Sequence, residues 1–235
     1  MLLRMPTPIV LIPGLYATPR LYFEQLPALW RLGPVTVADH TTHDDVDAIA
    51  AEILATAPPR FALAGLSMGG YVALAVQRAA PERVERLALL DTAATPDVEA
   101  VRDIRLHQIE LAREDRWEEI LEESWPWLVH ESRLGEQQLR DVLLQMYRET
   151  GSEAAIRQQT AIMNRPDARP ALAAIAVPTL VLVGDADQLT PPERSAEIAE
   201  AIPHARLTTI ADAGHMTAME RPEEVTRELV AWLTA

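Results

Sequence analysis

Ser67 stands in the run Gly65-Leu66-Ser67-Met68-Gly69, between an apolar segment and a segment with helical periodicity. A serine hydroxyl becomes an effective nucleophile when it is exposed, close to a base and near donors that can bind an oxyanion. A sharp turn from strand to helix lifts the side chain above the sheet edge and points N–H groups of the helix at the reacting carbonyl. The pattern alone also fits a glycine-rich turn with an incidental serine, but its flanking elements favour a nucleophile.

A serine nucleophile needs a base, and His215 has the most suitable context among the six histidines. It follows the last apolar run and precedes the last amphipathic segment. Loops that follow parallel strands meet at one edge of a sheet, so we expect His215 and Ser67 at the same edge. We expect His107 and His130 in a helical insertion and His204 in a surface turn.

His40 and His43 lie in the acidic run Asp39-His40-Thr41-Thr42-His43-Asp44-Asp45, after the second apolar run. Imidazole and carboxylate groups that lie together can form a metal site. We favour a capped, solvated loop instead. The sequence therefore predicts no metal ion and no organic cofactor.

Three aspartates follow apolar runs and could orient the His215 ring: Asp91, Asp185 and Asp187. Each would lie at the edge of the sheet that carries Ser67. Such a carboxylate holds the imidazole in the useful tautomer and stabilises the imidazolium that forms. With Asp187 the chain order is serine, aspartate, histidine, which differs from the orders in chymotrypsin and subtilisin.

The elements that must position these groups are short apolar runs alternating with longer amphipathic segments. This alternation predicts an α/β fold, in which a mostly parallel sheet of about six strands lies between helices in a three-layer α/β/α arrangement. The expected strands are Pro8–Ile12, Val35–Asp39, Arg60–Gly65, Val84–Leu90, Thr179–Val183 and Arg206–Ile210. The expected helices are Pro19–Trp30, Asp44–Ala57, Met68–Ala80, Pro192–Ala201 and Pro222–Leu233.

The alternation stops over residues 97–168, which are rich in Glu, Arg, Gln, Leu and Trp. Helical periodicity, divided at Gly135 and Gly151, predicts three or four helices there. We expect residues 1–96 and 169–235 to form the core, and the inserted helices to form a lid over the strand ends. A plain packing subdomain is the alternative.

The chain of 235 residues has 35 acidic and 21 basic side chains, a formal net charge of −14. This charge disfavours binding to nucleic acid and to anionic membranes, and no apolar run approaches the roughly 18 residues of a membrane span. The absence of cysteine excludes disulfides, thiolate metal sites and a cysteine nucleophile. The run Met1–Pro6 lacks the apolar core of a signal peptide. We expect a cytoplasmic monomer or small homo-oligomer that acts on a small-molecule substrate.

Together these motifs resemble the α/β-hydrolase fold, from about Thr7 to the C-terminus. Three residues fit the family's Gly-x-x-Asp-x-x-x-Pro pattern: Gly184, Asp187 and Pro191. The pattern selects Asp187 over Asp185 as the orienting acid. The pair Gly214-His215 matches the Gly-His pair that precedes the family's final helix, so the resemblance makes this histidine the base.

The family's first strand often ends in a His-Gly turn, and the next residue donates a backbone N–H to the oxyanion. Here the turn is Pro13-Gly14-Leu15, with proline in place of that histidine. The resemblance therefore assigns the two oxyanion donors to the N–H groups of Leu15 and Met68. Backbone donors tolerate leucine and methionine because the side chain does not supply the hydrogen bond.

Two features depart from the family pattern. Many relatives have a Gly-rich Asp-x-Arg-Gly-x-Gly turn where this chain has His40-Thr41-Thr42-His43-Asp44, which changes one wall near the site. The first expected strand starts soon after Met1, which leaves no room for the antiparallel hairpin that opens many relatives. We therefore expect six strands, all parallel.

The resemblance implies a serine esterase that cleaves a small or medium carboxylic ester through an acyl-enzyme at Ser67. A serine excludes the haloalkane dehalogenases and epoxide hydrolases of this fold, which use a carboxylate nucleophile. The alternatives are enol-lactone hydrolysis, carbon–carbon bond hydrolysis, cofactor-free perhydrolysis and ligand binding by a signalling protein. Four residues are candidate pocket walls, although each also suits an ordinary core: Tyr16, Trp125, Trp127 and Met216.

Overall fold

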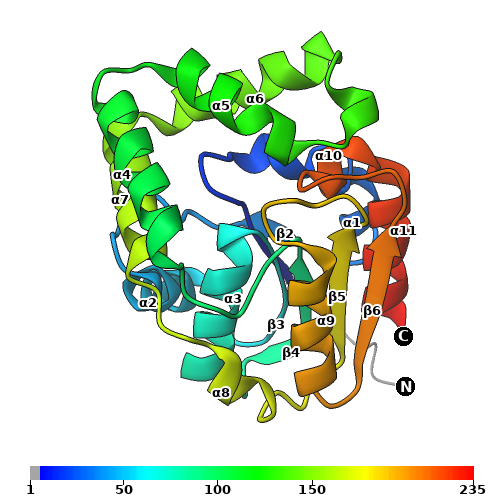
Figure 1. Cartoon of the computed structure of the whole chain (residues 1–235). Helices are drawn as coiled ribbons and strands as arrows, with labels where there is room; N and C mark the ends of the chain where they lie inside the picture. Colours follow the sequence, from blue (N-terminus) through cyan, green and yellow to red (C-terminus); the bar gives the residue numbers. More distant parts are fainter. Residues whose placement is uncertain (1–5) are drawn as a thin grey trace, which may run out of the picture.

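The apolar runs of the sequence form one six-stranded parallel sheet with helices on both faces (Figure 1). The computed structural model describes residues 6–235, so the start of the run Met1–Pro6, used for the signal-peptide prediction, lies outside the described residues. The strand order is β2-β1-β3-β4-β5-β6, which confirms the predicted fold class. The strands are β1 (Ile9–Ile12), β2 (Val35–Val37), β3 (Phe61–Leu66), β4 (Val84–Leu90), β5 (Thr179–Gly184) and β6 (Ala205–Ile210).

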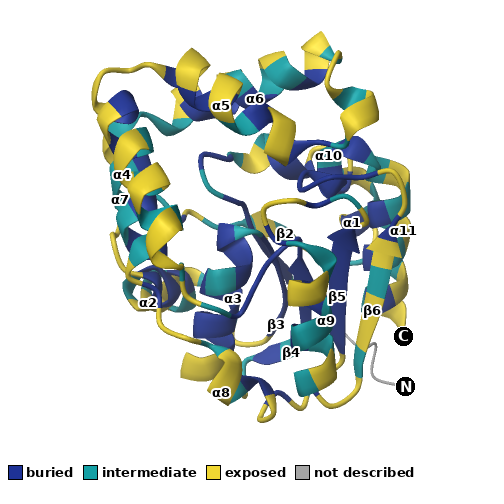
Figure 2. Ribbon diagram, in the orientation of Figure 1, coloured by how far each residue is buried: buried dark blue, intermediate teal, exposed yellow. Residues whose placement is uncertain are grey.

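Both faces of the central strands are covered, because β1, β3 and β5 are buried along their whole length. In β1, Ile9 and Leu11 pack into one core cluster and Val10 and Ile12 into the other. Figure 2 shows these strands buried and the outer faces of the helices exposed. The helices on the first face include α1 (Leu26–Leu29) and α11 (Pro222–Thr234), and those on the second include α2 (Val46–Thr56), α3 (Met68–Ala79) and α9 (Pro192–Ala201).

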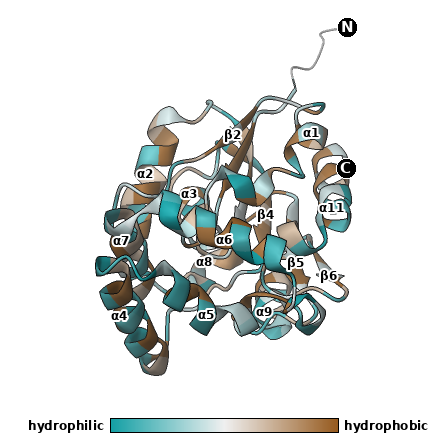
Figure 3. Ribbon diagram, turned by 90° about the horizontal axis from the view of Figure 1, so that it is seen from above, coloured by the Kyte–Doolittle hydropathy of each residue, from teal (hydrophilic) through white to brown (hydrophobic). Residues whose placement is uncertain are grey.

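Residues 97–168 contain four α-helices and one 3-10 helix, which agrees with the predicted helical content. These are α4 (Glu99–Arg113), α5 (Trp117–Leu128), η2 (Glu131–Arg133), α6 (Gln137–Thr150) and α7 (Ser152–Met163). In Figure 1, α5 and α6 lie beyond the carboxyl ends of the strands, and α4 and α7 pack together beside them. Figure 3 shows α5 and α6 from above, with largely hydrophilic outer surfaces. Two further short helices follow in the chain: α8 (Arg169–Leu172) and α10 (Thr217–Glu220).

The predicted helix Pro19–Trp30 is wrong. The structure has a 3-10 helix, η1 (Pro19–Tyr22), then a turn, then the single turn of α1. Thr18 caps η1, because its side chain accepts the backbone N–H of Arg20. Pro27 has no N–H and its ring crowds the carbonyl four residues earlier, which disfavours one continuous helix; Pro27 lies instead in the first turn of α1.

Within residues 6–235, none of the helices combines the length and the apolar character needed to traverse a bilayer.

Candidate active site

Ser67 occupies the turn between β3 and α3. Its φ is 55°, in the left-handed region that non-glycine residues rarely adopt. A Cβ added to Gly65 would lie 2.1 Å from the carbonyl oxygen of Gly69, and one added to Gly69 would lie 2.1 Å from that of Ile12. Both glycines are therefore required, because side chains there would force the turn apart.

His215 lies in the loop between β6 and α10, next to the turn that carries Ser67. Its Nε2 is 2.8 Å from Ser67 Oγ, and its Nδ1 is 2.8 Å from Asp187 Oδ2. With Nδ1–H donating to the carboxylate, Nε2 is free to accept the hydrogen of the serine hydroxyl. The side chains of His215 and Asp187 are 4% and 0% exposed, so little water competes for these bonds. The structure thus brings the three side chains into one hydrogen-bonded line.

The carboxylate of Asp187 is held in one orientation by its neighbours in the loop after β5. Its Oδ1 accepts the backbone N–H groups of Leu189 at 2.9 Å and Thr190 at 3.0 Å. Its Oδ2 accepts the Thr190 hydroxyl at 2.7 Å, beside the bond from His215. These contacts aim Oδ2 at the imidazole ring.

The other two candidate aspartates have different partners. Asp185 accepts a backbone N–H of the loop before the histidine. Asp91 is fully buried, where Oδ1 accepts the Gly184 N–H at 3.0 Å and Oδ2 accepts the hydroxyl of Thr217. Burial raises the pKa of Asp91 well above its ordinary value, and the negative charge of Asp187 acts in the same direction.

Glu220 of α10 fixes the loop that carries His215, a role that the sequence did not indicate. Glu220 is 1% exposed, and its carboxylate accepts the N–H groups of Gly214 at 2.9 Å, Met216 at 3.2 Å and His130 at 2.7 Å. Burial raises the pKa of Glu220, although these three hydrogen bonds oppose the shift. Nothing in the local sequence distinguishes it from the many exposed glutamates.

The turn after β1 lies directly against the serine. A Cβ added to Gly14 would lie 3.4 Å from Ser67 Cβ. Within residues 6–235, the backbone N–H groups of Leu15 and Met68 have no hydrogen-bond acceptor. Both groups are therefore free to bind another acceptor beside the serine.

Two buried side chains hold this turn in place, and neither was identified from the sequence. His40 is 2% exposed and its Nε2 lies 2.9 Å from the carbonyl oxygen of Gly14. The prediction of a solvated loop is therefore wrong at His40, because the chain after β2 packs under the turn, whereas His43 stays exposed. Burial lowers the pKa of His40, which favours the neutral ring donating Nε2–H to the carbonyl. Gln158 of α7 accepts the backbone N–H of Tyr16 at 3.0 Å.

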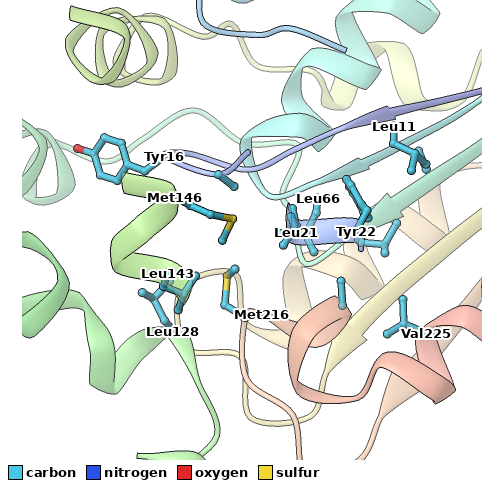
Figure 4. Close-up of a cluster of buried hydrophobic side chains, with 14 of the residues drawn as sticks. Leu11, Tyr16, Leu21, Tyr22, Leu66, Leu128, Leu143, Met146, Met216 and Val225 are labelled. Carbon is cyan, nitrogen blue, oxygen red and sulfur yellow. The ribbon is translucent and has the colours of Figure 1, made fainter. Parts of the chain in front are cut away.

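A cavity of about 350 Å³ adjoins Ser67 and His215. Tyr16 and Met216 lie in its wall, where the sequence placed them. The helices of residues 97–168 contribute apolar side chains, among them Leu128, Leu143 and Met146. Figure 4 shows Met146 and Met216 in the space between α6 and the core.

Trp125 and Trp127 do not line this cavity, so their predicted pocket role is wrong. Trp125 is buried and its Nε1 donates to the Leu134 carbonyl at 3.0 Å, whereas Trp127 is 51% exposed. The α5 residues in the wall are Ser124 and Leu128. Residues four apart lie on the same face of a helix, and the two tryptophans fall on either side of that face.

Comparisons with known proteins identify the family. The sequence profile of the Alpha/beta hydrolase family matches residues 9–228. The chain belongs to the alpha/beta hydrolase family. RutD from Serratia proteamaculans (strain 568), named as a candidate carbamate hydrolase, is 30% identical over an alignment of 174 residues that covers 72% of this chain. The match spans 64% of the length of RutD, and a second curated relative is matched over 63% of its length.

Two solved structures cover nearly the whole of this alpha/beta hydrolase. A thermophilic esterase from Thermogutta terrifontis, with malate bound, has a TM-score of 0.87 and 30% identity, covering 98% of this chain and 90% of the esterase. An enol-lactonase from Burkholderia xenovorans LB400 has a TM-score of 0.88 and 26% identity, covering 97% of this chain and 92% of the enol-lactonase. The similar structures therefore include one protein described as an esterase and one described as an enol-lactonase.

Proposed function

We propose that this protein is a serine hydrolase that cleaves a small or medium carboxylic ester through an acyl-enzyme at Ser67. The observation that carries the proposal is the hydrogen-bonded line from Asp187 through His215 to Ser67, beside a cavity of about 350 Å³. As Ser67 Oγ attacks the ester carbonyl, His215 Nε2 takes the hydroxyl proton. Asp187 keeps Nδ1 protonated and stabilises the imidazolium.

The negative oxygen of the tetrahedral intermediate binds to the N–H groups of Leu15 and Met68. One such donor contributes about 3–4 kcal/mol to transition-state stabilisation. The imidazolium of His215 then protonates the leaving alkoxide as the carbon–oxygen bond breaks. A water molecule, deprotonated by His215, attacks the acyl group and releases the acid and free Ser67.

In this proposal the helices of residues 97–168 act as a lid. Leu128, Leu143 and Met146 supply apolar surface for the carbon chain of the ester. The half-exposed side chains of Val98 and Ile104, which also line the cavity, form its rim toward solvent.

Hydrolysis of p-nitrophenyl esters with two to eight acyl carbons tests the proposal. Wild-type protein is expected to release p-nitrophenol, and Ser67→Ala is expected to lose activity by about 10⁴-fold or more. Ser152→Ala is the matched control, because Ser152 binds Asp115 away from the cavity. Hydrolysis by Ser67→Ala near the wild-type rate, or no hydrolysis by folded wild-type protein, would overturn the proposal.

Hydrolysis of an enol-lactone is a second candidate, supported by the similarity to the enol-lactonase over 97% of this chain. The same attack by Ser67 opens a cyclic ester, but the leaving enol stays attached to the acyl group. Wild-type protein that consumes an enol-lactone, followed by the loss of its absorbance, but hydrolyses open-chain esters only slowly would favour this substrate. Ser67→Ala protein should not consume the lactone.

A further inference from the structure

The charge of the cavity wall is opposite to the charge of the chain. The chain has 35 acidic and 21 basic side chains, yet the cavity is lined by three arginines and one aspartate: Arg105, Arg165, Arg194 and Asp97. We propose that the substrate ester carries a carboxylate remote from the bond that is cleaved, and that Arg105 of α4 binds this carboxylate. The inference rests on the proposed function and narrows its substrate class to monoesters of dicarboxylic acids.

Asp97 lies between two of these arginines. Its Oδ1 is 2.7 Å from Arg165 Nη1, and its Oδ2 pairs with Arg105 Nε. Burial acts to raise the pKa of Asp97, but the hydrogen bonds and charges of the two arginines outweigh it and lower the pKa. Asp97 is therefore ionised at neutral pH and compensates only one of the two guanidinium charges.

The uncompensated charge is poorly exposed to water. The side chains of Arg105, Arg165 and Asp97 are 15%, 7% and 5% exposed. A buried charge without a partner is costly, and a second anion in the cavity would remove that cost. The group of three side chains therefore favours a negatively charged ligand over a neutral one.

Some N–H groups of Arg105 have no acceptor within the described residues and can bind a ligand. Its Nε and Nη2 donate to Asp97, and its Nη1 donates to Gln159 Oε1 at 2.9 Å. A guanidinium has five N–H groups, so two of them have no acceptor within the described chain. Two N–H groups on one planar fork suit the two oxygens of a carboxylate.

Gln159 links Arg105 to the turn beside the serine. Its Nε2 donates to the Tyr16 hydroxyl at 2.6 Å and to Gln108 Oε1 at 2.7 Å. The Tyr16 hydroxyl accepts this bond, and its own hydrogen has no acceptor among residues 6–235. Because Tyr16 follows Leu15 directly, these hydrogen bonds connect Arg105 to the turn that carries one of the proposed oxyanion donors.

The other two arginines are less suited to bind the ligand. Arg165 is held by the carbonyl oxygens of Thr95 at 3.0 Å and Ile162 at 2.9 Å, and it stacks 4.2 Å over the ring of Tyr71. Arg194 is half-exposed and lies near a glutamate of its own helix. These contacts leave Arg105 as the residue that recognises the carboxylate.

Steady-state hydrolysis of matched esters tests the inference. The substrates are the monomethyl esters of succinate, glutarate and adipate, each compared with its dimethyl ester. Wild-type protein is expected to prefer at least one anionic ester in kcat/KM by about 10- to 100-fold. Arg105→Gln is expected to lose that preference mainly through KM, whereas Arg105→Lys keeps part of it.

Arg113→Gln is the matched control, because Arg113 lies on the same helix but pairs with Glu110 at the surface. It removes the same charge from α4 and is expected to keep the preference. Equal rates for anionic and neutral esters, or a preference unchanged in Arg105→Gln, would overturn the inference while leaving the proposed function in place. No hydrolysis of either methyl ester by protein that hydrolyses p-nitrophenyl esters would overturn the inference alone, and no hydrolysis of any of these esters by folded protein would overturn both.

A binding measurement covers the case in which Arg105→Gln does not fold. Monomethyl glutarate is expected to raise the melting temperature of Ser67→Ala protein, and dimethyl glutarate at equal concentration is expected to raise it less. Equal shifts for the two esters, or a larger shift with the neutral one, would contradict a carboxylate subsite.

Discussion

The substitution Asp187→Asn separates the role of the carboxylate charge from its role in packing. The amide oxygen of asparagine can replace Oδ1 and keep the bonds from the N–H groups of Leu189 and Thr190, which are 2.9 Å and 3.0 Å long in the wild type. The amide nitrogen then stands in place of Oδ2, facing His215 Nδ1. The Thr190 hydroxyl can reverse its role, because a hydroxyl both donates and accepts.

The reversed hydrogen bond inactivates the base. An amide N–H directed at Nδ1 requires Nδ1 to accept, which moves the ring proton of His215 to Nε2. A protonated Nε2 cannot accept the hydrogen of Ser67, although the two atoms stay close to their present distance of 2.8 Å. The same tautomer change in a serine protease lowers kcat by about 10⁴, or about 5.5 kcal/mol.

Asp187→Asn should therefore lower the rate of ester hydrolysis without lowering the stability measured by urea denaturation. We expect the loss of about 10⁴-fold in kcat near pH 7 with little change in the free energy of unfolding. Asp91→Asn is the control, because that aspartate lies in the same buried region without contacting the ring. An Asp187→Asn enzyme that is folded and keeps more than about a tenth of the wild-type kcat would refute the tautomer argument.

Two further predictions concern stability. Gly69→Ala, which would place a Cβ 2.1 Å from the Ile12 carbonyl oxygen, should lower the free energy of unfolding by about 1–3 kcal/mol in urea titrations, and Gly135→Ala, with nothing within 4 Å, should not. Equal losses of unfolding free energy in Gly69→Ala and Gly135→Ala would contradict the close packing of Gly69 against the Ile12 carbonyl. The raised pKa of Asp91 means that the folded state binds its proton more tightly, so this group adds stability below its unfolded pKa that is lost as the pH rises through the folded value. Between the unfolded and the folded pKa of Asp91, the free energy of unfolding should fall by about 1.4 kcal/mol per pH unit, and Asp91→Asn should remove this fall. The same dependence of unfolding free energy on pH in the wild type and in Asp91→Asn would refute the prediction.

The fold was predictable because its signals are local. Continuous apolar runs such as Ile9–Ile12 and Leu180–Val183 must be buried on both faces, and this burial requires helices above and below a parallel sheet. The predicted helix Pro19–Trp30 is wrong because the helical pattern of the sequence continues through Pro27, which has no N–H to donate to a helical hydrogen bond. The pocket role of Trp125 is predicted from residue type, which does not show which face of α5 meets the cavity; Trp125 is buried in the core and is not in the cavity wall.

The residues that support the site were not predictable, because their partners are distant in the chain. Gln158 accepts the backbone N–H of Tyr16, which is 142 residues away in the chain, and His40 bonds to the carbonyl oxygen of Gly14, which is 26 residues away. Neither bond leaves a local pattern, since glutamine and histidine are ordinary in a helix or loop. Ser67 and His215 were identifiable because each follows a strand, and strand ends of a parallel sheet meet at one edge. The same argument left three aspartates open, and the resemblance to the family pattern selected Asp187 among them.

Labelling with a fluorophosphonate probe, located by mass spectrometry, tests the central claim of an activated serine most directly. Such probes modify a serine only when a base and oxyanion donors activate it. Wild-type protein is expected to be modified at Ser67, His215→Ala to lose the modification, and the surface variant His204→Ala to keep it. Folded wild-type protein that is not labelled at Ser67, or labelling that persists in His215→Ala, would contradict the account.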